Sequence, residues 1–241
     1  MIFFIIRLES IDSTQSYAKK HAAEFPPHQI TCISAEEQTA GRGRFQRHWV
    51  SPKGLNLYTT FYFRLPSSMK DLISLAQVMA CSLARLLLES GLEPKIKWPN
   101  DIQLNGKKLS GVLCETVFGK NEVEIFLGIG INVNMGADLL EKIDQPATSL
   151  KKETGKEWDR NELLKKLQTH WLSDLELFKK EGFAPFHDFL ENHLAYKNEE
   201  IRFFDGKKEW VGICHSLTKD GQLNILLNDN TIHKVVSGEI F

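Results

Sequence analysis

The residues best suited to chemistry lie between positions 41 and 49, where three arginines fall within six residues. Glycines leave backbone N–H groups open to close approach, and guanidinium groups are planar, permanently charged donors that match phosphate oxygens. The pattern predicts a loop that grips a phosphate, with a solvated loop or a nucleic-acid contact as the alternative. It is not a Walker loop, because the G-x-x-x-x-G-K-[ST] pattern is absent. The run reads Gly41, Arg42, Gly43, Arg44, Phe45, Gln46, Arg47, His48 and Trp49.

A second polar group follows the expected strand that ends at Lys97 and Trp98, where Pro99, Asn100 and Asp101 come next. An amide and a carboxylate at the end of a strand lie where binding sites commonly form. The alternative is ordinary Asn-Asp turn chemistry with a core tryptophan, and the segment alone favours neither interpretation.

Two glycine-containing strands complete the set of candidates. Lys108 stands at the start of one strand and could complete a clamp on an α-phosphate, although a lysine there is often only an exposed hairpin end. Gly111 removes a side chain where a ligand could approach. Gly128 and Gly130 interrupt the next strand, before Asn132, and packing against a flat ligand explains them as well as a dinucleotide fold does.

Other chemistries leave no trace in the sequence. The eight histidines show neither H-E-x-x-H spacing nor a cluster with cysteine, and no G-x-S-x-G motif occurs. We therefore expect no metal held by protein ligands alone and no serine nucleophile.

Hydrophobic periodicity predicts the alternating α/β chain that must position these residues. Asn105-Gly106 predicts a two-residue type I′ turn, Ser68 with Asp71 resembles a capping box, and Asp159 is expected to cap a helix reciprocally with Glu162. The expected elements are a buried strand at 1–6, a helix at 12–25, strands at 30–36 and 55–63, a helix at 72–90, strands within 95–133, a helix at 159–182, a short helix at 185–195 and short strands over 201–236.

Composition excludes several classes of protein. The 241 residues are 42% hydrophobic and 25% charged, which is typical of a globular fold rather than disorder or coiled coil. The formal net charge of −1 gives no overall attraction to nucleic acid or anionic lipid. No segment is expected to span a membrane. The scattered cysteines, Cys32, Cys81, Cys114 and Cys214, are typical of free buried thiols in a reducing cytoplasm.

These motifs, in this order, closely resemble those of the biotin protein ligase family. The matching residues are Asp12-Ser13-Thr14, Gln38, Gly41-Arg42-Gly43-Arg44 with Trp49, Lys97-Trp98-Pro99-Asn100-Asp101, Lys108-Leu109-Ser110-Gly111, Gly128-Ile129-Gly130-Ile131-Asn132 and Gly238-Glu239-Ile240. The resemblance implies an α/β (α+β) fold: a class II synthetase-like catalytic domain with a mixed sheet and flanking helices over residues 1–195, and a small SH3-like β-barrel over residues 196–241. So small a barrel buries little core alone and should dock on the larger domain.

The same resemblance implies an activity. Biotin and MgATP would form biotinyl-5′-adenylate, and a lysine on the biotin carrier domain of a carboxylase would then accept the biotinyl group. ATP with Mg2+ and biotin would be the small molecules used, and the implied form is monofunctional, since Ser13-Thr14 leaves no room before it for a DNA-binding domain. Neither DNA nor membrane is an expected partner. A monomer and a homodimer both fit the sequence.

The resemblance also implies roles for individual residues. Arg44, Lys108 and Asp101 would be catalytic, with Asp101 a candidate to take a proton from the acceptor lysine. The biotin and adenylate contacts would be Ser13, Thr14, Gln15, Gln38, Gly41, Arg42, Gly43, Arg44, Lys108 and Gly111. The ATP contacts would be Lys97, Asn100 and Asn132.

Two departures and two rivals remain. Gln15 stands where the family often has Asn, and Gln46 stands where it often has Gly, which should stiffen the loop. A lipoate or octanoyl ligase-like acyltransferase would share the fold, and a non-catalytic biotin or nucleotide-binding regulator is the rival from another class. The motifs at 41–44 and 97–101 favour biotin over lipoate, and intact Arg44 and Lys108 favour catalysis over binding alone.

Overall fold

Two β-sheets organise the protein, whose computed structural model describes residues 3–241 apart from the side chain of Gln46. The larger sheet has seven strands in the order β1-β2-β3-β7-β6-β5-β4, and it is mixed because β1 and β2 run parallel while the other neighbours are antiparallel. This mixed sheet confirms the predicted fold class. The strands are β1 (Phe3–Leu8), β2 (Ile30–Ala35), β3 (Leu57–Pro66), β4 (Lys95–Lys97), β5 (Asp101–Leu104), β6 (Lys107–Phe118) and β7 (Glu122–Ile131).

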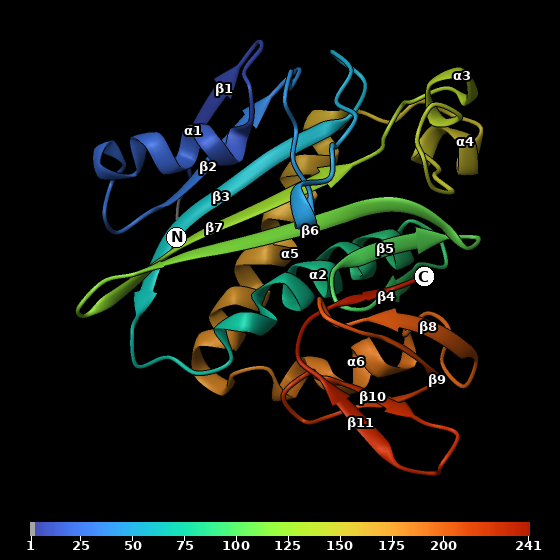
Figure 1. Cartoon of the computed structure of the whole chain (residues 1–241). Coiled ribbons are helices and arrows are strands. Elements are labelled where there is room, and N and C mark those ends of the chain that lie inside the picture. Colours follow the sequence, from blue (N-terminus) through green and yellow to red (C-terminus); the bar gives the residue numbers. More distant parts are fainter. Residues whose placement is uncertain (1–2) are drawn as a thin grey trace.

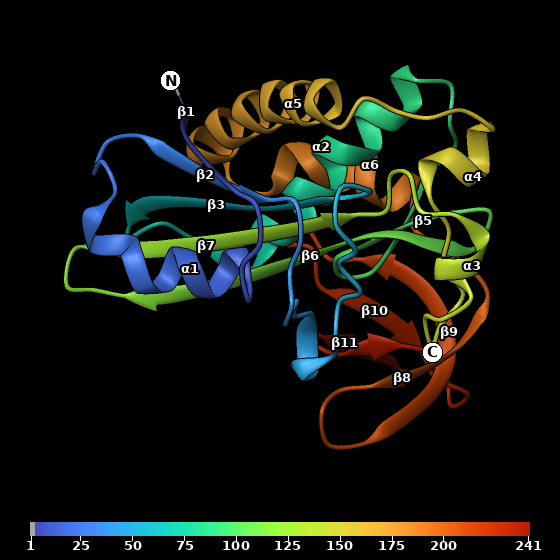
Figure 2. The ribbon, with the colours of Figure 1, turned by 90° about the horizontal axis from the view of Figure 1, so that it is seen from above.

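Helices cover both faces of this sheet. Figure 2 shows α1 on one face and α2 with α5 on the other. The predicted helices at 72–90 and 159–182 correspond to α2 and α5, and α5 ends at Gly182 as expected. Sequence periodicity missed the two short helices α3 and α4. The helices are α1 (Thr14–His21), α2 (Leu75–Glu89), α3 (Ala137–Leu140), α4 (Leu150–Thr154), α5 (Arg160–Glu181) and α6 (His187–Asn192).

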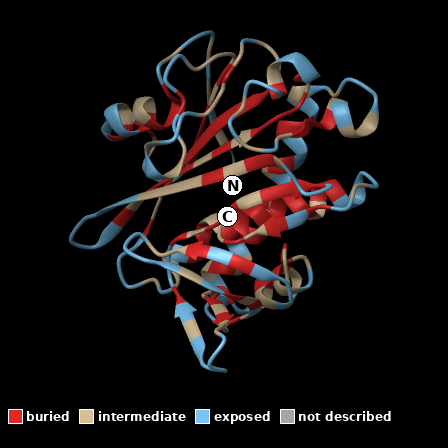
Figure 3. Ribbon diagram, turned by 45° about the vertical axis from the view of Figure 1, so that its right-hand side comes forward, coloured by how far each residue is buried: buried red, intermediate tan, exposed pale blue. Residues whose placement is uncertain are grey.

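The main core lies between the sheet and the pair α2 and α5, and Figure 3 shows buried segments gathered in the middle of the molecule. Trp171 of α5 packs on Phe61 and Phe63 of β3, with ring centroids 6.4 and 5.9 Å apart. Among the described residues, Leu72–Glu89 is the one helical stretch long and apolar enough to cross a membrane, contrary to our expectation of none. Because 72% of that window is buried between the sheet, α5 and α6, its apolar composition reflects a core helix.

A smaller hydrophobic cluster fixes α1 on the opposite face. Ala18 of α1 packs with Phe25, Tyr62 and Phe126. The ring centroid of Tyr62 lies 5.3 Å from that of Phe25 and 5.1 Å from that of Phe126. Ser13 caps the helix, because its side chain accepts a hydrogen bond from the N–H of Gln15. The start of α1 is therefore held rigidly over the centre of the sheet.

The second sheet is antiparallel, in the order β11-β10-β9-β8-β12, and it lies below the first in Figure 1. Trp98 Nε1 and Gln77 Nε2 both donate hydrogen bonds to the carbonyl of Gly221, and Trp98 packs on Phe203 at 6.0 Å. The predicted boundary near residue 196 falls between α6 and β8 and stays a prediction. The strands are β8 (Glu200–Phe204), β9 (Glu209–Leu217), β10 (Leu223–Leu226), β11 (Ile232–Val235) and β12 (Glu239–Ile240).

Several local predictions were wrong. The first strand is not buried, because β1 is an outer strand and Phe4 and Ile5 are 41% and 46% exposed. The first helix ends at His21 and passes into a 3-10 turn rather than continuing to residue 25. The capping box expected of Asp71 does not form, since Asp71 precedes the 3-10 turn Leu72–Ser74 with a left-handed backbone and its carboxylate accepts the N–H of Phe183 instead of a helix N–H.

Other local predictions were confirmed. Asn105 and Gly106 both have positive φ, as the hairpin turn requires. Asp159 caps α5 through the N–H groups of Asn161 and Glu162, which confirms half of the predicted reciprocal cap, while the Glu162 carboxylate pairs with Lys166 instead. The four cysteines are free, and Cys114 is only half-buried while the other three are buried.

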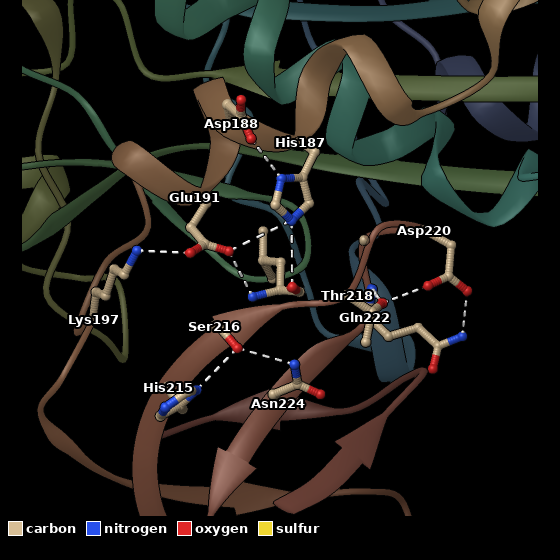
Figure 4. Close-up of polar contacts among 12 residues, drawn as sticks. His187, Asp188, Glu191, Lys197, His215, Ser216, Thr218, Asp220, Gln222 and Asn224 are labelled. Atoms are coloured by element: carbon tan, nitrogen blue, oxygen red, sulfur yellow. Dashed lines mark hydrogen bonds and ion pairs between the residues drawn. The ribbon is translucent and has the colours of Figure 1, made fainter.

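An ionic junction joins α6 to the second sheet (Figure 4). His187 Nδ1 lies 2.8 Å from an Asp188 oxygen, and Nε2 lies 3.3 Å from the Leu217 carbonyl and 3.5 Å from Glu191. All of these partners are acceptors, so only the doubly protonated ring satisfies both nitrogens. Burial lowers the pKa of His187, but the hydrogen bonds to Asp188 and Leu217 and the charge of Glu191 outweigh it and raise the pKa.

We predict that this junction makes stability depend on pH. A raised folded pKa gives stabilisation that is complete below the unfolded pKa, about 6.5, and is lost as pH rises through the folded value. The difference in unfolding free energy between wild type and His187→Gln should therefore be largest below about pH 6.5 and shrink as pH rises above it in urea titrations. His215→Gln is the control, because that ring contacts a serine hydroxyl. A difference that does not change with pH would contradict the assignment.

Candidate functional site

One pocket collects nearly all of the residues that the sequence singled out. It encloses about 890 Å³, including the space at its open mouth, above the centre of the large sheet. Gly41 and Asn132 are the predicted residues outside its lining. The predicted residues within it are Ser13, Thr14, Gln15, Gln38, Arg42, Gly43, Arg44, Lys97, Asn100, Asp101, Lys108 and Gly111.

Hydrogen bonds between four segments build the inner end of the pocket. The Thr14 N–H and hydroxyl donate to Gln38 Oε1 at 2.9 and 3.2 Å, and Gln38 Nε2 donates to Ser51 Oγ at 3.1 Å. Thr60 of β3 donates to the Thr14 hydroxyl at 2.9 Å. A side chain at Gly41 would lie 2.6 Å from the Trp49 carbonyl, so this glycine allows the loop to pack closely behind the pocket. The inner end is therefore preorganised and polar.

Gln15 spans the floor of this polar end. Its Nε2 donates to the Phe126 carbonyl at 2.8 Å and to Glu115 at 3.0 Å, and its Oε1 would lie 2.8 Å from a side chain at Gly128. Burial raises the pKa of Glu115, but hydrogen bonds from Lys19 and Gln15 outweigh it and lower the pKa. Position 128 must therefore be glycine because the Gln15 side chain occupies the space that another side chain would need.

The arginine loop is ordered by its own backbone. The Gly43 N–H donates to the Arg47 carbonyl at 2.8 Å, and the Trp49 N–H donates to the Gly41 carbonyl at 2.9 Å. Arg42 donates to Ser16 Oγ at 2.9 Å. The expected stiffening by Gln46 concerns a side chain outside the described part of the protein.

The second sheet holds two of the loop's arginines. Arg44 Nη1 donates to the Gly238 carbonyl at 3.0 Å and to Asn100 Oδ1 at 3.2 Å, and Nη2 donates to Ser237 Oγ at 3.4 Å. Burial lowers the pKa of Arg44. Arg47 forms an ion pair with Glu239. The loop is thus fastened to the segment before β12.

Two lysines also line the pocket. Lys108 Nζ lies 2.6 Å from an Asp101 oxygen and 5.5 Å from the centre of a Trp49 ring. Burial lowers the pKa of Lys97. Together with Arg44, these lining cations are suited to binding phosphate oxygens.

Trp49 explains the glycine-broken strand. A side chain at Gly130 would lie 2.5 Å from the indole, and one at Gly111 would lie 3.4 Å from it. The flat group that β7 accommodates is therefore this tryptophan, where the sequence suggested a flat ligand. Trp49 Nε1 is buried and has no hydrogen-bond partner within the described residues.

Asn132 lies outside the pocket lining, and some lining residues were not predicted from the sequence. Asn132 is buried and donates to the Thr148 carbonyl at 3.0 Å, so it supports the chain behind the pocket. Sequence reasoning missed Thr60, Gln145 and Glu239 as lining residues. Only Glu239 had a signal, the Gly238-Glu239-Ile240 match near the C-terminus.

Metal binding by protein ligands alone finds no support in the part of the chain that the structure describes, where no group of three or more His, Cys, Asp or Glu side chains converges. Asp101 and Glu239 are the acidic side chains that line the pocket. They suit a cation that arrives with a nucleotide, since Mg2+ is usually bound through phosphates and one or two carboxylates.

Comparisons with known proteins show which family and fold the chain resembles. The model of the biotin/lipoate A/B protein ligase family matches residues 8–132. The chain is 36% identical over 236 residues to the bifunctional ligase/repressor BirA of Escherichia coli, covering 97% of this chain and 72% of that protein. It is 33% identical over 225 residues to the biotin--[acetyl-CoA-carboxylase] ligase of Paracoccus denitrificans, covering 90% and 91%. The structure of the Aquifex aeolicus biotin protein ligase with biotin and ATP superposes with a TM-score of 0.84, at 35% identity over 98% of this chain and 97% of that one.

We predict that Glu239 holds the arginine loop in place. Glu239→Gln removes the charge that pairs with Arg47, so trypsin should cut within residues 41–49 several times faster than in the wild type. Glu209→Gln is the matched control, because Glu209 pairs with Arg202 on the same sheet and does not line the pocket. Mass spectrometry measures the cleavage rate of each variant. Equal rates in the two variants would show that the ion pair does not restrain the loop.

Proposed function

The chain belongs to the biotin/lipoate A/B protein ligase family and is a biotin ligase, and from this premise we propose a two-step reaction for it. Biotin and ATP form biotinyl-5′-adenylate, which then donates its biotinyl group to a lysine of the biotin carrier domain of a carboxylase. The observation that carries the proposal is the pocket itself, in which a polar inner end adjoins the cations Arg44 and Lys108. The free cysteines agree with a reducing cytoplasm as the place of action.

In the first step, a biotin carboxylate oxygen bonds to the α-phosphorus of ATP, and pyrophosphate leaves with the electrons of the broken P–O bond. Two anions must meet, so the barrier falls when fixed cations stabilise the developing charge. We assign this role to Arg44 and Lys108, assisted by Arg42. Mg2+ would neutralise charge on the phosphates, with Asp101 and Glu239 as the acidic groups beside it.

The inner end of the pocket fits the biotin portion. Ser13, Thr14, Gln15 and Gln38 offer donors and acceptors whose geometry is fixed by the network around Thr60. Gly111 has no side chain, which leaves space in the pocket where the reacting atoms would lie. This fixed arrangement supports binding a polar ring system without reorganisation.

The ATP side is assigned to Lys97 and Asn100. Lys97 is a cation that burial has partly desolvated, and Asn100 is held by its bond from Arg44. Asn132 lies outside the lining, so we give it a supporting role behind the pocket.

In the second step, the acceptor amine bonds to the acyl carbon, the C–O bond to phosphate breaks, and AMP leaves with that electron pair. The lysine gives up one proton before attack and a second when the amide forms. Asp101 lies in the pocket beside Lys108 and is our candidate for the first proton. Lys108 would then need to exchange this partner for the phosphate.

The test of the function is direct. Protein, MgATP and labelled biotin are incubated with a carrier domain, and with a carrier whose acceptor lysine is replaced by arginine as the control. We expect label on the first carrier alone, and labelled lipoate should not replace biotin. A protein that is folded but labels no carrier would overturn the ligase assignment, and labelling by lipoate would favour the acyltransferase rival.

Asp101→Asn separates the two steps. If Asp101 takes the proton of the acceptor lysine, transfer from preformed adenylate should slow by about 10²-fold, within the range for general base catalysis. Adenylate formation, followed as pyrophosphate release, is measured separately, because Asp101 also lies on the side of the pocket assigned to Mg2+. The transfer assay starts from preformed adenylate and does not depend on that step. An unchanged transfer rate would remove Asp101 from the catalytic residues.

A further inference from the structure

Glu115 of β6 binds a pocket residue from outside the pocket. One of its oxygens lies 2.6 Å from Lys19 Nζ, and the other accepts a hydrogen bond from Gln15 Nε2 at 3.0 Å. Gln15 and Lys19 are four residues apart on α1, so they lie on the same face of that helix. Gln15 lines the pocket and is 4% exposed, whereas Glu115 lies outside the lining. A carboxylate on the sheet thus fixes a buried amide of the binding site.

Both partners of Gln15 Nε2 can only accept hydrogen bonds. One is the Phe126 carbonyl at 2.8 Å, and the other is Glu115, which is paired with Phe126 across β6 and β7. Burial raises the pKa of Glu115, but the bonds from Lys19 and Gln15 outweigh it, so the carboxyl group is ionised at neutral pH. An amide turned the other way would place its oxygen against two acceptors. Oε1 of Gln15 is therefore the atom that faces the Thr60 hydroxyl, at 3.1 Å.

This orientation decides how many protons are available at the inner end of the pocket. The Thr60 hydroxyl carries one proton but has two acceptors within reach, Gln15 Oε1 at 3.1 Å and Thr14 Oγ1 at 2.9 Å. Thr14 in turn donates its hydroxyl proton to Gln38 Oε1. One acceptor in this chain of lining residues is therefore left without a proton. A Gln15 amide in the opposite orientation would donate a proton to Thr60, and the missing proton would be supplied.

We propose that Glu115 is a positioning residue, which keeps the Gln15 oxygen toward Thr60 so that the inner end of the pocket selects a ring that donates N–H groups. The inference rests on the proposed function, because it explains how the pocket would choose the ring of biotin. That ring is a cyclic urea with two N–H donors, whereas the ring of lipoate is a disulfide with none. A buried acceptor that gains no donor from the ligand opposes binding, so lipoate is disfavoured.

A surface ion pair with Lys19 is the simpler role for Glu115. Such a pair contributes little to stability and would leave the affinity for a ligand unchanged. The two roles have different requirements. The ion pair needs the negative charge of Glu115, whereas the Gln15 amide needs only an oxygen that accepts its hydrogen bond.

Three substitutions separate these roles. Glu115→Ala removes the acceptor, and Glu115→Gln keeps an accepting oxygen for Gln15 while it removes the charge that pairs with Lys19. Glu124→Ala is the matched control on the neighbouring strand, because its carboxylate binds the Tyr62 hydroxyl and its side chain is 29% exposed, against 33% for Glu115. Calorimetry measures the dissociation constants of biotin and of a biotin with both ring nitrogens methylated, and steady-state assays measure the KM for ATP.

We expect Glu115→Ala to weaken the binding of biotin about fivefold, as the loss of one hydrogen bond does. Glu115→Gln and Glu124→Ala should bind biotin within about twofold of wild type, and the KM for ATP should stay within the same range in every variant. A general disturbance of the fold would change both constants. The methylated biotin has no N–H to donate, so Glu115→Ala should not weaken its binding further.

A double-mutant cycle tests whether Glu115 acts through Gln15. Gln15→Ala removes the amide, so adding Glu115→Ala to it should have no further effect on the binding of biotin. Additive losses would overturn the inference, and so would a Glu115→Gln variant that binds biotin as weakly as Glu115→Ala.

The outcomes separate this inference from the function on which it rests. If the wild type binds biotin and Glu115→Ala binds it equally well, Glu115 has no positioning role and the ligase function stands. If the wild type neither binds biotin nor labels a carrier domain, the proposed function fails and this inference fails with it.

Discussion

The site depends on one half-buried guanidinium group that joins three distant parts of the chain. Arg44 comes from the glycine-rich loop and donates to Asn100 at the end of the large sheet and to Ser237 and Gly238 beside β12. These acceptors are all uncharged, whereas Arg47 and Lys108 are paired directly with carboxylates. Arg44 is therefore positioned without being neutralised, and its full charge remains for an anionic ligand.

This interaction links the two sheets functionally. The pocket needs Gly238 and Glu239 from the second sheet, and Trp98 and Gln77 both bond to Gly221 of that sheet. The site would thus contain residues from both sides of a domain boundary near residue 196. Burial of Trp98 at the contact makes the relative placement of the sheets part of the geometry that holds Arg44.

Local patterns predicted much of the molecule because local rules determine those parts. The Asn105-Gly106 turn follows from backbone sterics, α5 from its cap at Asp159 and its apolar stripe, and the arginine loop from residue type alone. Hydrophobicity could not show that β1 would be an outer strand, since strand order is decided by tertiary pairing.

The parts of the site that were missed all involve contacts between distant segments. Gly130 is required by Trp49, which lies 81 positions earlier in the sequence. Arg47 finds Glu239, 192 positions away, and Asn132 is drawn into the core by its bond to Thr148. The sequence shows that a glycine leaves space or that a glutamate carries a charge. Only the fold shows which residue fills that space or pairs with that charge.

The most direct test of this central role of Arg44 is calorimetric binding of a non-hydrolysable biotinyl-adenylate analogue to wild type and to Arg44→Met, which keeps an apolar stem. Hydrogen bonds to a charged group contribute about 1.5–3 kcal/mol, so the affinity of the variant should fall by roughly 10- to 100-fold at a temperature where circular dichroism shows it to be folded. An affinity within about twofold of wild type would contradict the account.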